Sequence, residues 1–416
     1  MKKITTILIG AGNRGKIYTD YALTNPDKLK VIGIVEPTVD RRESFAEKHN
    51  ISAENCFTDW EELFKREKFA NTVMICTQDK MHFAPAMAAI EKGYDILLEK
   101  PISPILEECT ALANAAEGKG VKVVVCHILR YTPFFSELKR IIDSGEIGEL
   151  VSLVHNENVG NIHYSHSYVR GNWRNKSESA PMILAKACHD TDIIQWLIGK
   201  KCLRLSSFGS LKYFNKKNCP DDAPKHCLDG CPHSVTCPYD AKKLYIDDNP
   251  YKDWFRGTSA ASVHATDEQV YAALRTGAYG RCVFKCDNDV VDHQTVNMEF
   301  EDGVTAIFSM CAFTPEISRS IKIMGTKGQI KGHMGENSII VTDFLSQKER
   351  EIKIDDIGGH VGHGGGDVGI MQAFCEYIAN GYSNTEISDV RISEENHMIS
   401  FAAEESRLSG GKVLEL

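Results

Sequence analysis

The sequence predicts a chain of two domains, an α/β domain on a parallel sheet and then an α+β domain with a large, open, mostly antiparallel sheet. The length of 416 residues is ample for two hydrophobic cores. Apolar runs alternate with helix-like stretches in the first third, which is typical of parallel strands covered on both faces. Long strand-like segments dominate afterwards. We expect domains at 1–130 and 131–416, with a cysteine-rich insert near 215–245.

The first domain is expected to hold five strands joined by helices. Short runs rich in Val, Ile and Leu predict strands at 4–9, 31–37, 71–77, 94–101 and 122–127. The helix-like stretches between them run to Leu23 and over 39–49, 82–92 and 104–117. Parallel pairing follows, because the chain crosses a helix before each new strand.

The second domain is expected to be rich in strands. Strand-like segments lie at 149–159, 203–213, 281–286, 292–300, 304–313, 318–324 and 338–343. Helices are expected at 181–198, 367–380 and 392–407. This pattern favours an open sheet with one face backed by helices.

Composition and charge exclude several classes of function. With 42% hydrophobic and 25% charged residues the chain is an ordinary globular protein, and its net charge of -9 argues against nucleic acid or an anionic membrane as partner. The N-terminal "MKKITTILIGAGNRG" has too short an apolar run for a secretion signal, and no run reaches the roughly 18 apolar residues of a membrane span. We expect a soluble, cytoplasmic protein.

A glycine loop follows the first strand. "GAGNRG" places Gly10, Gly12 and Gly15 in the turn between strand and helix, with Asn13 and Arg14 among them. Gly10 permits the tight turn, Gly12 allows a pyrophosphate to approach the backbone, and Gly15 allows close packing of helix and strand. The loop predicts a dinucleotide-binding Rossmann domain in which these five residues contact the cofactor.

Glu36 ends the second strand of that domain. A carboxylate at this place binds both ribose hydroxyls of a dinucleotide. It would repel a 2′-phosphate, so NAD is favoured over NADP, although Arg41 and Arg42 lie nearby. Thr77, His82, Glu99 and Lys100 complete the expected cofactor-binding set.

"LLEKPIS" puts Glu99-Lys100-Pro101 at the carboxyl end of a strand, where open α/β sheets bind ligands. A cation there holds a substrate hydroxyl and favours its alkoxide form as hydride leaves. Together with the glycine loop, Glu36 and the pair His189-Asp190, this stretch resembles the glucose–fructose oxidoreductase/inositol dehydrogenase (Gfo/Idh/MocA) family along nearly the whole chain. The resemblance implies that the first domain binds NAD(P), that the second supplies the substrate site, and that Lys100 lies beside both ligands.

The stretch "ILAKACHDTD" at 183–192 carries ionisable side chains within an apolar helix. On a continuous helix Lys186, His189 and Asp192 follow one i, i+3, i+6 row. The resemblance makes His189 the proton-transfer residue, but the aspartate usual in the family falls on Ala185. Lys186, also placed in the catalytic set, is expected either to lower the pKa of His189 or to point away. A zinc site or a Cys188–His189 nucleophile is disfavoured by the bearing of Cys188.

The segment 155–175 is rich in Asn, His, Tyr, Arg and Trp. Polyhydroxylated rings are bound by bidentate polar groups and flat apolar faces. The expected substrate-binding residues are His163, His166, Arg170, Trp173, Arg174 and His189. Two further candidates are "DHQ" at 292–294 and "GHGGGD" at 362–367, whose glycines let backbone approach a ligand or form a turn.

Four cysteines cluster in "CPDDAPKHCLDGCPHSVTCP". Cys219, Cys227, Cys231 and Cys237 could close a tetrahedral zinc site that stabilises the insert. An iron–sulfur cluster and free thiols are the alternatives. The family resemblance gives this insert no role.

These observations favour an NAD-dependent oxidoreductase that transfers hydride between nicotinamide and a hydroxyl-bearing carbon of a sugar or cyclitol. Two alternatives stay open: a glycoside-cleaving enzyme that uses tightly bound NAD in a transient oxidation–elimination cycle, and a non-catalytic NAD-binding sensor. The expected partner is a small carbohydrate, and an exposed sheet face of the kind that pairs in the family implies a homo-dimer or homo-tetramer.

Overall fold

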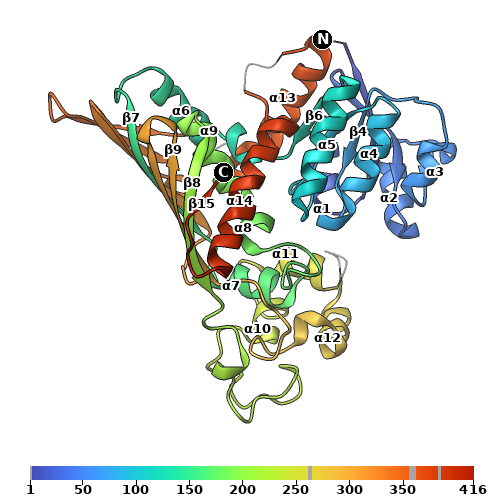
Figure 1. Cartoon of the computed structure of the whole chain (residues 1–416). Coiled ribbons are helices and arrows are strands. Elements are labelled where there is room, and N and C mark those ends of the chain that lie inside the picture. Colours follow the sequence, from blue (N-terminus) through green and yellow to red (C-terminus); the bar gives the residue numbers. More distant parts are fainter. Residues whose placement is uncertain (1, 261–264, 356–361, 383–385) are drawn as a thin grey trace.

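The computed structural model describes residues 2–260, 265–355, 362–382 and 386–416. Its first sheet has six parallel strands in the order β3-β2-β1-β4-β5-β6, and Figure 1 shows it flanked by helices. The predicted α/β class is confirmed. The strands are β1 (Ile4–Ile9), β2 (Leu29–Val35), β3 (Cys56–Phe57), β4 (Thr72–Ile75), β5 (Asp95–Leu98) and β6 (Val123–Val125).

Helices cover both faces of this sheet, and most residues of its strands are apolar and buried. Two of them end on a residue in the left-handed conformation, Asn50 after α2 and Gly120 after α5, as C-caps commonly do. The helices of this part are α1 (Asn13–Thr24), α2 (Val39–His49), α3 (Trp60–Phe64), α4 (Phe83–Glu91) and α5 (Leu106–Lys119).

The end of the chain returns to the first sheet. Helix α13 (Gly366–Asn380) packs on α1, and its Ile370 and Phe374 are fully buried against Met74 and Leu97 of the sheet. Helix α14 (Val390–Leu408) contacts both α5 and the second sheet, and Figure 1 shows it running between the two sheets. The two C-terminal helices therefore join the two parts of the molecule.

The second sheet has nine strands in the order β14-β13-β12-β11-β7-β10-β9-β8-β15. Only β10 and β7 pair in parallel, so the predicted mostly antiparallel sheet is confirmed. One face packs on α6 (Pro133–Asp143) and α14, which gives β9 its alternating burial. The strands are β7 (Leu150–Asn158), β8 (Cys202–Ser210), β9 (His293–Phe300), β10 (Thr305–Cys311), β11 (Ser318–Gly325), β12 (Gly328–His333), β13 (Ser338–Asp343), β14 (Glu349–Lys353) and β15 (Leu414–Glu415).

Two predicted elements are wrong in detail. The helix expected over 181–198 is divided into α8 (Met182–Ala185) and α9 (Cys188–Ile198), because the chain leaves helical geometry at Ala187. The strand expected over 281–286 is absent; the amide of Cys282 donates to the carbonyl of Lys225, and that of Lys285 to the carbonyl of Cys282, which makes a turn.

The insert forms a small body with its own core. Phe255, Tyr245 and Leu274 are buried there together. Figure 1 shows this region below the two sheets, and it comprises α10 (Ala241–Tyr245), α11 (Lys252–Ser259) and α12 (Asp267–Thr276). The short helix α7 (Asn161–Tyr164) and a wider turn at Ser165–Arg170 pack against it, through Ile162 and His166. Among the described residues, no helix is both long and apolar enough to cross a membrane.

Candidate cofactor and substrate site

The glycine loop has the geometry of a dinucleotide cradle. Gly10 has a φ of +94°, and a Cβ there would lie 2.8 Å from the carbonyl oxygen of Cys76. A Cβ on Gly15 would lie 2.3 Å from the carbonyl oxygen of Gly10, whereas a Cβ on Gly12 would meet nothing within 4 Å. Helix α1 starts at Asn13 with no acidic residue in its first turn, so its positive end is free for a pyrophosphate.

Glu36 lies where β2 ends and is held by the backbone around it. Its Oε2 accepts a hydrogen bond from the amide of Ala11 at 2.9 Å, and its Oε1 accepts one from the amide of Thr38 at 3.0 Å. Arg42 donates instead to the carbonyl of Glu36 at 2.6 Å. The carboxylate is thus fixed beside the glycine loop, at the end of the second strand.

Arg14 and Glu99 are bound to each other. Arg14 Nε lies 2.9 Å from Glu99 Oε1, and its Nη2 lies 2.5 Å from Asp367 Oδ1 at the start of α13. Tyr18 also donates to Glu99, at 2.7 Å. Burial alone would raise the pKa of Glu99, but the cations of Arg14 and Lys100 reverse this effect and hold it below its usual value. These side chains fasten the loops that surround the cofactor cradle.

Thr77 and His82 shape the loop after β4. The hydroxyl of Thr77 donates to the carbonyl of Met81 at 3.0 Å. The two ring nitrogens of His82 lie 2.7 Å from the carbonyl oxygen of Pro101 and 3.1 Å from that of Thr77. His82 therefore links the loops that follow β4 and β5.

Lys100 and His189 meet across the two parts of the chain. Lys100 Nζ donates to the carbonyl of Ala185, at the end of α8, at 2.7 Å. His189 begins the first turn of α9 and is only 6% exposed. Burial, and after it the cation of Lys100, lowers the pKa of His189 well below its usual value. The imidazole is therefore neutral at pH 7 and can accept a proton.

Lys186 does not share a helical row with His189. It lies in the break between α8 and α9, and its Nζ forms an ion pair with Glu157 Oε1 on β7 at 3.1 Å. The expectation that Lys186 lowers the pKa of His189 is corrected, because burial and Lys100 are the main causes of that shift. Because of the break between α8 and α9, the side chain of Lys186 points toward the second sheet.

A buried network that the sequence did not reveal lies beneath His189. Asp190 Oδ1 is 2.8 Å from His155 Nε2 and 2.7 Å from Arg319 Nε. Arg319 Nη2 in turn lies 2.7 Å from Glu157 Oε2. Burial raises the pKa of Glu157, whereas Arg319 and His155 hold that of Asp190 below its usual value against the opposing effect of burial. The network ties α9 to β7 and β11.

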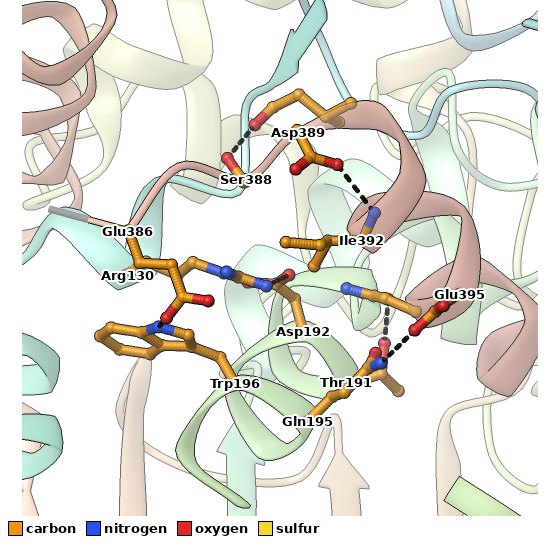
Figure 2. A network of polar contacts seen from close by, with 12 residues as sticks. Arg130, Thr191, Asp192, Gln195, Trp196, Glu386, Ser388, Asp389, Ile392 and Glu395 are labelled. Atoms are coloured by element: carbon orange, nitrogen blue, oxygen red, sulfur yellow. Dashed lines mark hydrogen bonds and ion pairs between the residues drawn. The ribbon is translucent and has the colours of Figure 1, made fainter. Parts of the chain in front are cut away.

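The opposite side of α9 is fastened by a second network, which Figure 2 shows. Arg130 grips Asp192 with two hydrogen bonds of 2.7 and 2.6 Å, and both side chains are buried. Trp196 Nε1 donates to Glu386 at 2.8 Å. Asp192 is therefore a structural anchor of the helix that carries His189.

The expected substrate-binding residues separate into two groups. Trp173 reaches toward the first part of the chain, where its Nε1 lies 3.5 Å from Asp79, whereas the buried His163 packs on Trp254 of α11 at 5.1 Å between ring centres. The other three side chains are engaged in the insert and its surroundings. His166 stacks on Phe255, Arg170 donates to the carbonyls of Tyr239 and Arg281, and Arg174 pairs with Asp287 and Glu178.

The cysteine cluster gives no support to a metal centre. In the parts of the chain that the structure describes, no three His, Cys, Asp or Glu side chains are arranged to hold a metal ion. Cys219 and Cys237 pack against the main core of the second domain, whereas Cys227 packs against the separate core of the insert. Neither the expected zinc nor the iron–sulfur cluster is supported.

Comparison with known proteins places the chain in a family. Residues 4–127 match the family described as "Oxidoreductase family, NAD-binding Rossmann fold", and residues 139–382 match "Oxidoreductase family, C-terminal alpha/beta domain". YteT of Bacillus subtilis, named as an oxidoreductase, is 25% identical over 313 residues, which cover 71% of this chain and 69% of that protein.

Two further relatives bear more specific names. The scyllo-inositol 2-dehydrogenase (NAD(+)) of Bacillus subtilis is 25% identical over 213 residues, 50% of this chain and 58% of that enzyme. The structure of a levoglucosan dehydrogenase in complex with NADH matches 99% of both chains with a TM-score of 0.71 and 18% identity, a likeness of fold. The two family matches span both sheets and the site between them, and this chain belongs to the GFO_IDH_MocA family of NAD-binding oxidoreductases.

Proposed function

We propose that the protein transfers hydride between nicotinamide and a hydroxyl-bearing carbon of a sugar or cyclitol. The observation that carries the proposal is the meeting of two groups from different domains. Lys100 leaves β5 and reaches the carbonyl of Ala185 at 2.7 Å, four residues before the buried, neutral His189. A cation and a neutral base beside a dinucleotide cradle are the groups that oxidation of an alcohol requires.

The cofactor would be held by the glycine loop and Glu36. The open approach at Gly12 and the unopposed N-terminus of α1 fit a pyrophosphate, and the fixed carboxylate of Glu36 fits ribose hydroxyls. That carboxylate also disfavours a 2′-phosphate, which supports NAD over NADP. When bound, the nicotinamide supplies the hydride acceptor or donor.

The chain's own residues handle the proton and the developing charge. His189 accepts the hydroxyl proton as the carbinol carbon is oxidised and returns it in the reverse direction. Lys100 stabilises the alkoxide that forms at the same oxygen. The ion-paired network of Asp190 and Arg319 keeps α9, and with it His189, in place during the step.

The substrate class is supported by the names of relatives. One relative is named for inositol and one structural neighbour for levoglucosan, both polyhydroxylated rings.

The experiment is a screen of NADH formation with a panel of inositols, aldoses, uronates and anhydrosugars. Wild-type protein is compared with His189→Asn and Lys100→Met, and NADH binding is measured for all three. The proposal expects turnover of at least one ring by the wild type and its loss, by roughly 100-fold or more, in both variants with cofactor binding kept. Equal turnover in wild type and variants would refute it.

A further inference from the structure

His363 lies beside the candidate catalytic histidine although it belongs to the far end of the chain. It stands in the turn before α13, where His363, Gly364 and Gly365 have φ values of +52°, +60° and +89°. Its ring centre is 6.4 Å from that of His189. The side chain of His363 is 42% exposed, whereas His189 is buried.

Asp367 fixes the orientation of this imidazole. His363 Nδ1 lies 3.2 Å from Asp367 Oδ2, four residues later on α13. Burial opposes ionisation of Asp367, but hydrogen bonds from His363 and Arg14 outweigh it and bring its pKa to about 2. Arg14 Nη1, which only donates, also lies 3.5 Å from Nδ1 of His363. The contact with the ionised carboxylate, which only accepts, is the shorter one and favours a hydrogen on Nδ1 and a lone pair on Nε2.

His189 needs a route by which its proton reaches solvent. It is enclosed by His127 and His363, with ring centres at 6.0 and 6.4 Å. Its Nδ1 is buried and, among the described residues, has no hydrogen-bond partner. His127 is itself fully buried, so His363 is the one of these two neighbours that leads outward. The spacing of the two rings suits a single bridging water.

We infer that His363, oriented by Asp367, carries the substrate-derived proton between His189 and solvent; the inference rests on the proposed function. The step moves a proton and no electrons. His189, protonated by the substrate hydroxyl, passes the proton through one water to Nε2 of His363. The imidazolium of His363 is held by Asp367 and releases the proton to solvent, and the steps reverse when a ketone is reduced.

The charges around His363 suit a transient carrier. Asp367 favours its charged form, whereas burial, Arg14 of α1 and Lys186 disfavour that form, and the net effect lowers its pKa. His189, Lys100 and Arg319 complete the ionisable surroundings of the pair. His363 therefore releases an accepted proton readily, as a transient carrier must.

The test uses the full-length protein with NAD and the ring substrate found in the screen. His363→Gln is expected to lower the single-turnover rate of NADH formation by roughly 10- to 100-fold at low buffer concentration, with Kd for NADH unchanged. Added imidazole buffer should restore the rate in proportion to its concentration, and the solvent deuterium isotope effect should increase. If His363 had only a structural role, imidazole would not restore the rate of His363→Gln, and the solvent deuterium isotope effect would not change.

His233→Gln is the matched control. His233 Nε2 also lies against a carboxylate, Asp222 Oδ1 at 2.6 Å, and its side chain is 39% exposed in the insert. This variant should keep the wild-type rate. If His363→Gln also keeps it, or loses it without rescue by imidazole, the inference is overturned while the proposed function stands. If wild-type protein oxidises no ring, the proposed function fails first and the inference with it.

A second measurement reads the orientation without turnover. In ¹⁵N spectra of the NAD-loaded protein, assigned with His363→Gln, His363 should show a protonated Nδ1 and an unprotonated Nε2 near pH 7.5. Asp367→Asn should mix the two tautomers. An Nε2-protonated His363 in the wild type would contradict the inference.

Discussion

At the residue scale, the properties of His189 come from its surroundings more than from its neighbours in sequence. The side chain is buried at the first turn of α9, and the cation that lowers its pKa most is Lys100 from the other domain. Both effects favour the neutral imidazole. Lys186, which is three residues away in the chain, is held by Glu157 instead.

The pH profile distinguishes these two lysines. His189 acts as a base only at a pH above its pKa. Lys100 lowers this pKa, so the substitution Lys100→Met should raise the pKa of His189. The acid limb of the kcat/KM profile should then move to higher pH, at a reduced plateau. Lys186→Met should leave the limb in place. A shift caused only by Lys186→Met would contradict the assignment.

Glu36 should set the choice of cofactor. Glu36→Ser removes the carboxylate that lies beside the amide of Ala11 and is proposed to accept hydrogen bonds from the ribose hydroxyls. Hydrogen bonds to a charged group contribute about 1.5–3 kcal/mol. The Kd for NADH, measured by fluorescence titration, should rise roughly 10- to 100-fold and the preference over NADPH should shrink. Glu43→Ser on the exposed face of α2 is the control and should change neither value. An unchanged preference in Glu36→Ser would remove Glu36 from the cofactor site.

Candidate site residues that belong to a local sequence motif were predictable. Contacts that depend on how two strands align in the sheet were not. The glycine loop, Glu36 and Lys100 each follow the end of a predicted strand, and the family resemblance singled out His189. Asp190, Arg319 and Glu157 meet only because β7 and β11 pair in a particular register. His363 was noted as part of a glycine turn, but its distance from His189 depends on the return of α13.

At the element scale, α9 is the piece that positions the site. It is tied to β7 and β11 by Asp190 and to the loop after β6 by Asp192. The break at Ala187 separates it from α8, and a periodicity of apolar residues does not reveal such a break. Strands β12 and β14 were missed for a similar reason, because glycines and charges hide their alternation.

Breaking the Arg130–Asp192 pair tests how firmly α9 is held. Arg130→Met leaves a buried carboxylate without its partner and should lower the free energy of unfolding by about 3–5 kcal/mol, measured by urea denaturation. The double variant Arg130→Met/Asp192→Leu should recover most of this loss. Arg350→Met, which breaks an exposed pair with Glu146, should cost under about 1 kcal/mol. Equal losses in the two single variants would show that the buried pair is not an anchor.

At the scale of the whole molecule, the two predicted domains interlock. Helix α13 covers one face of the first sheet, and the carbonyl of Ser388 accepts a hydrogen bond from Val125 of β6. The sequence alone does not show that α13 packs back on the first sheet, because the pattern of an apolar helix does not tell which sheet it will cover.

This interlocking predicts the behaviour of a fragment. Residues 2–130 alone should lack the cover that Ile370, Met371 and Phe374 supply to the sheet. The fragment should aggregate or bind a hydrophobic dye, and should bind NADH far more weakly than the full chain. A soluble fragment with the full chain's affinity would show that α13 is dispensable for the cofactor site.

The most direct test of the proposed chemistry follows the hydride itself. A ring substrate of the screen, labelled with deuterium at the oxidised carbon, is turned over once with NAD, and the reduced cofactor is analysed by mass spectrometry. The account predicts deuterium in NADH from the wild type and none above background from His189→Asn. Product formed without deuterium in the cofactor would contradict direct hydride transfer at the site of Lys100 and His189.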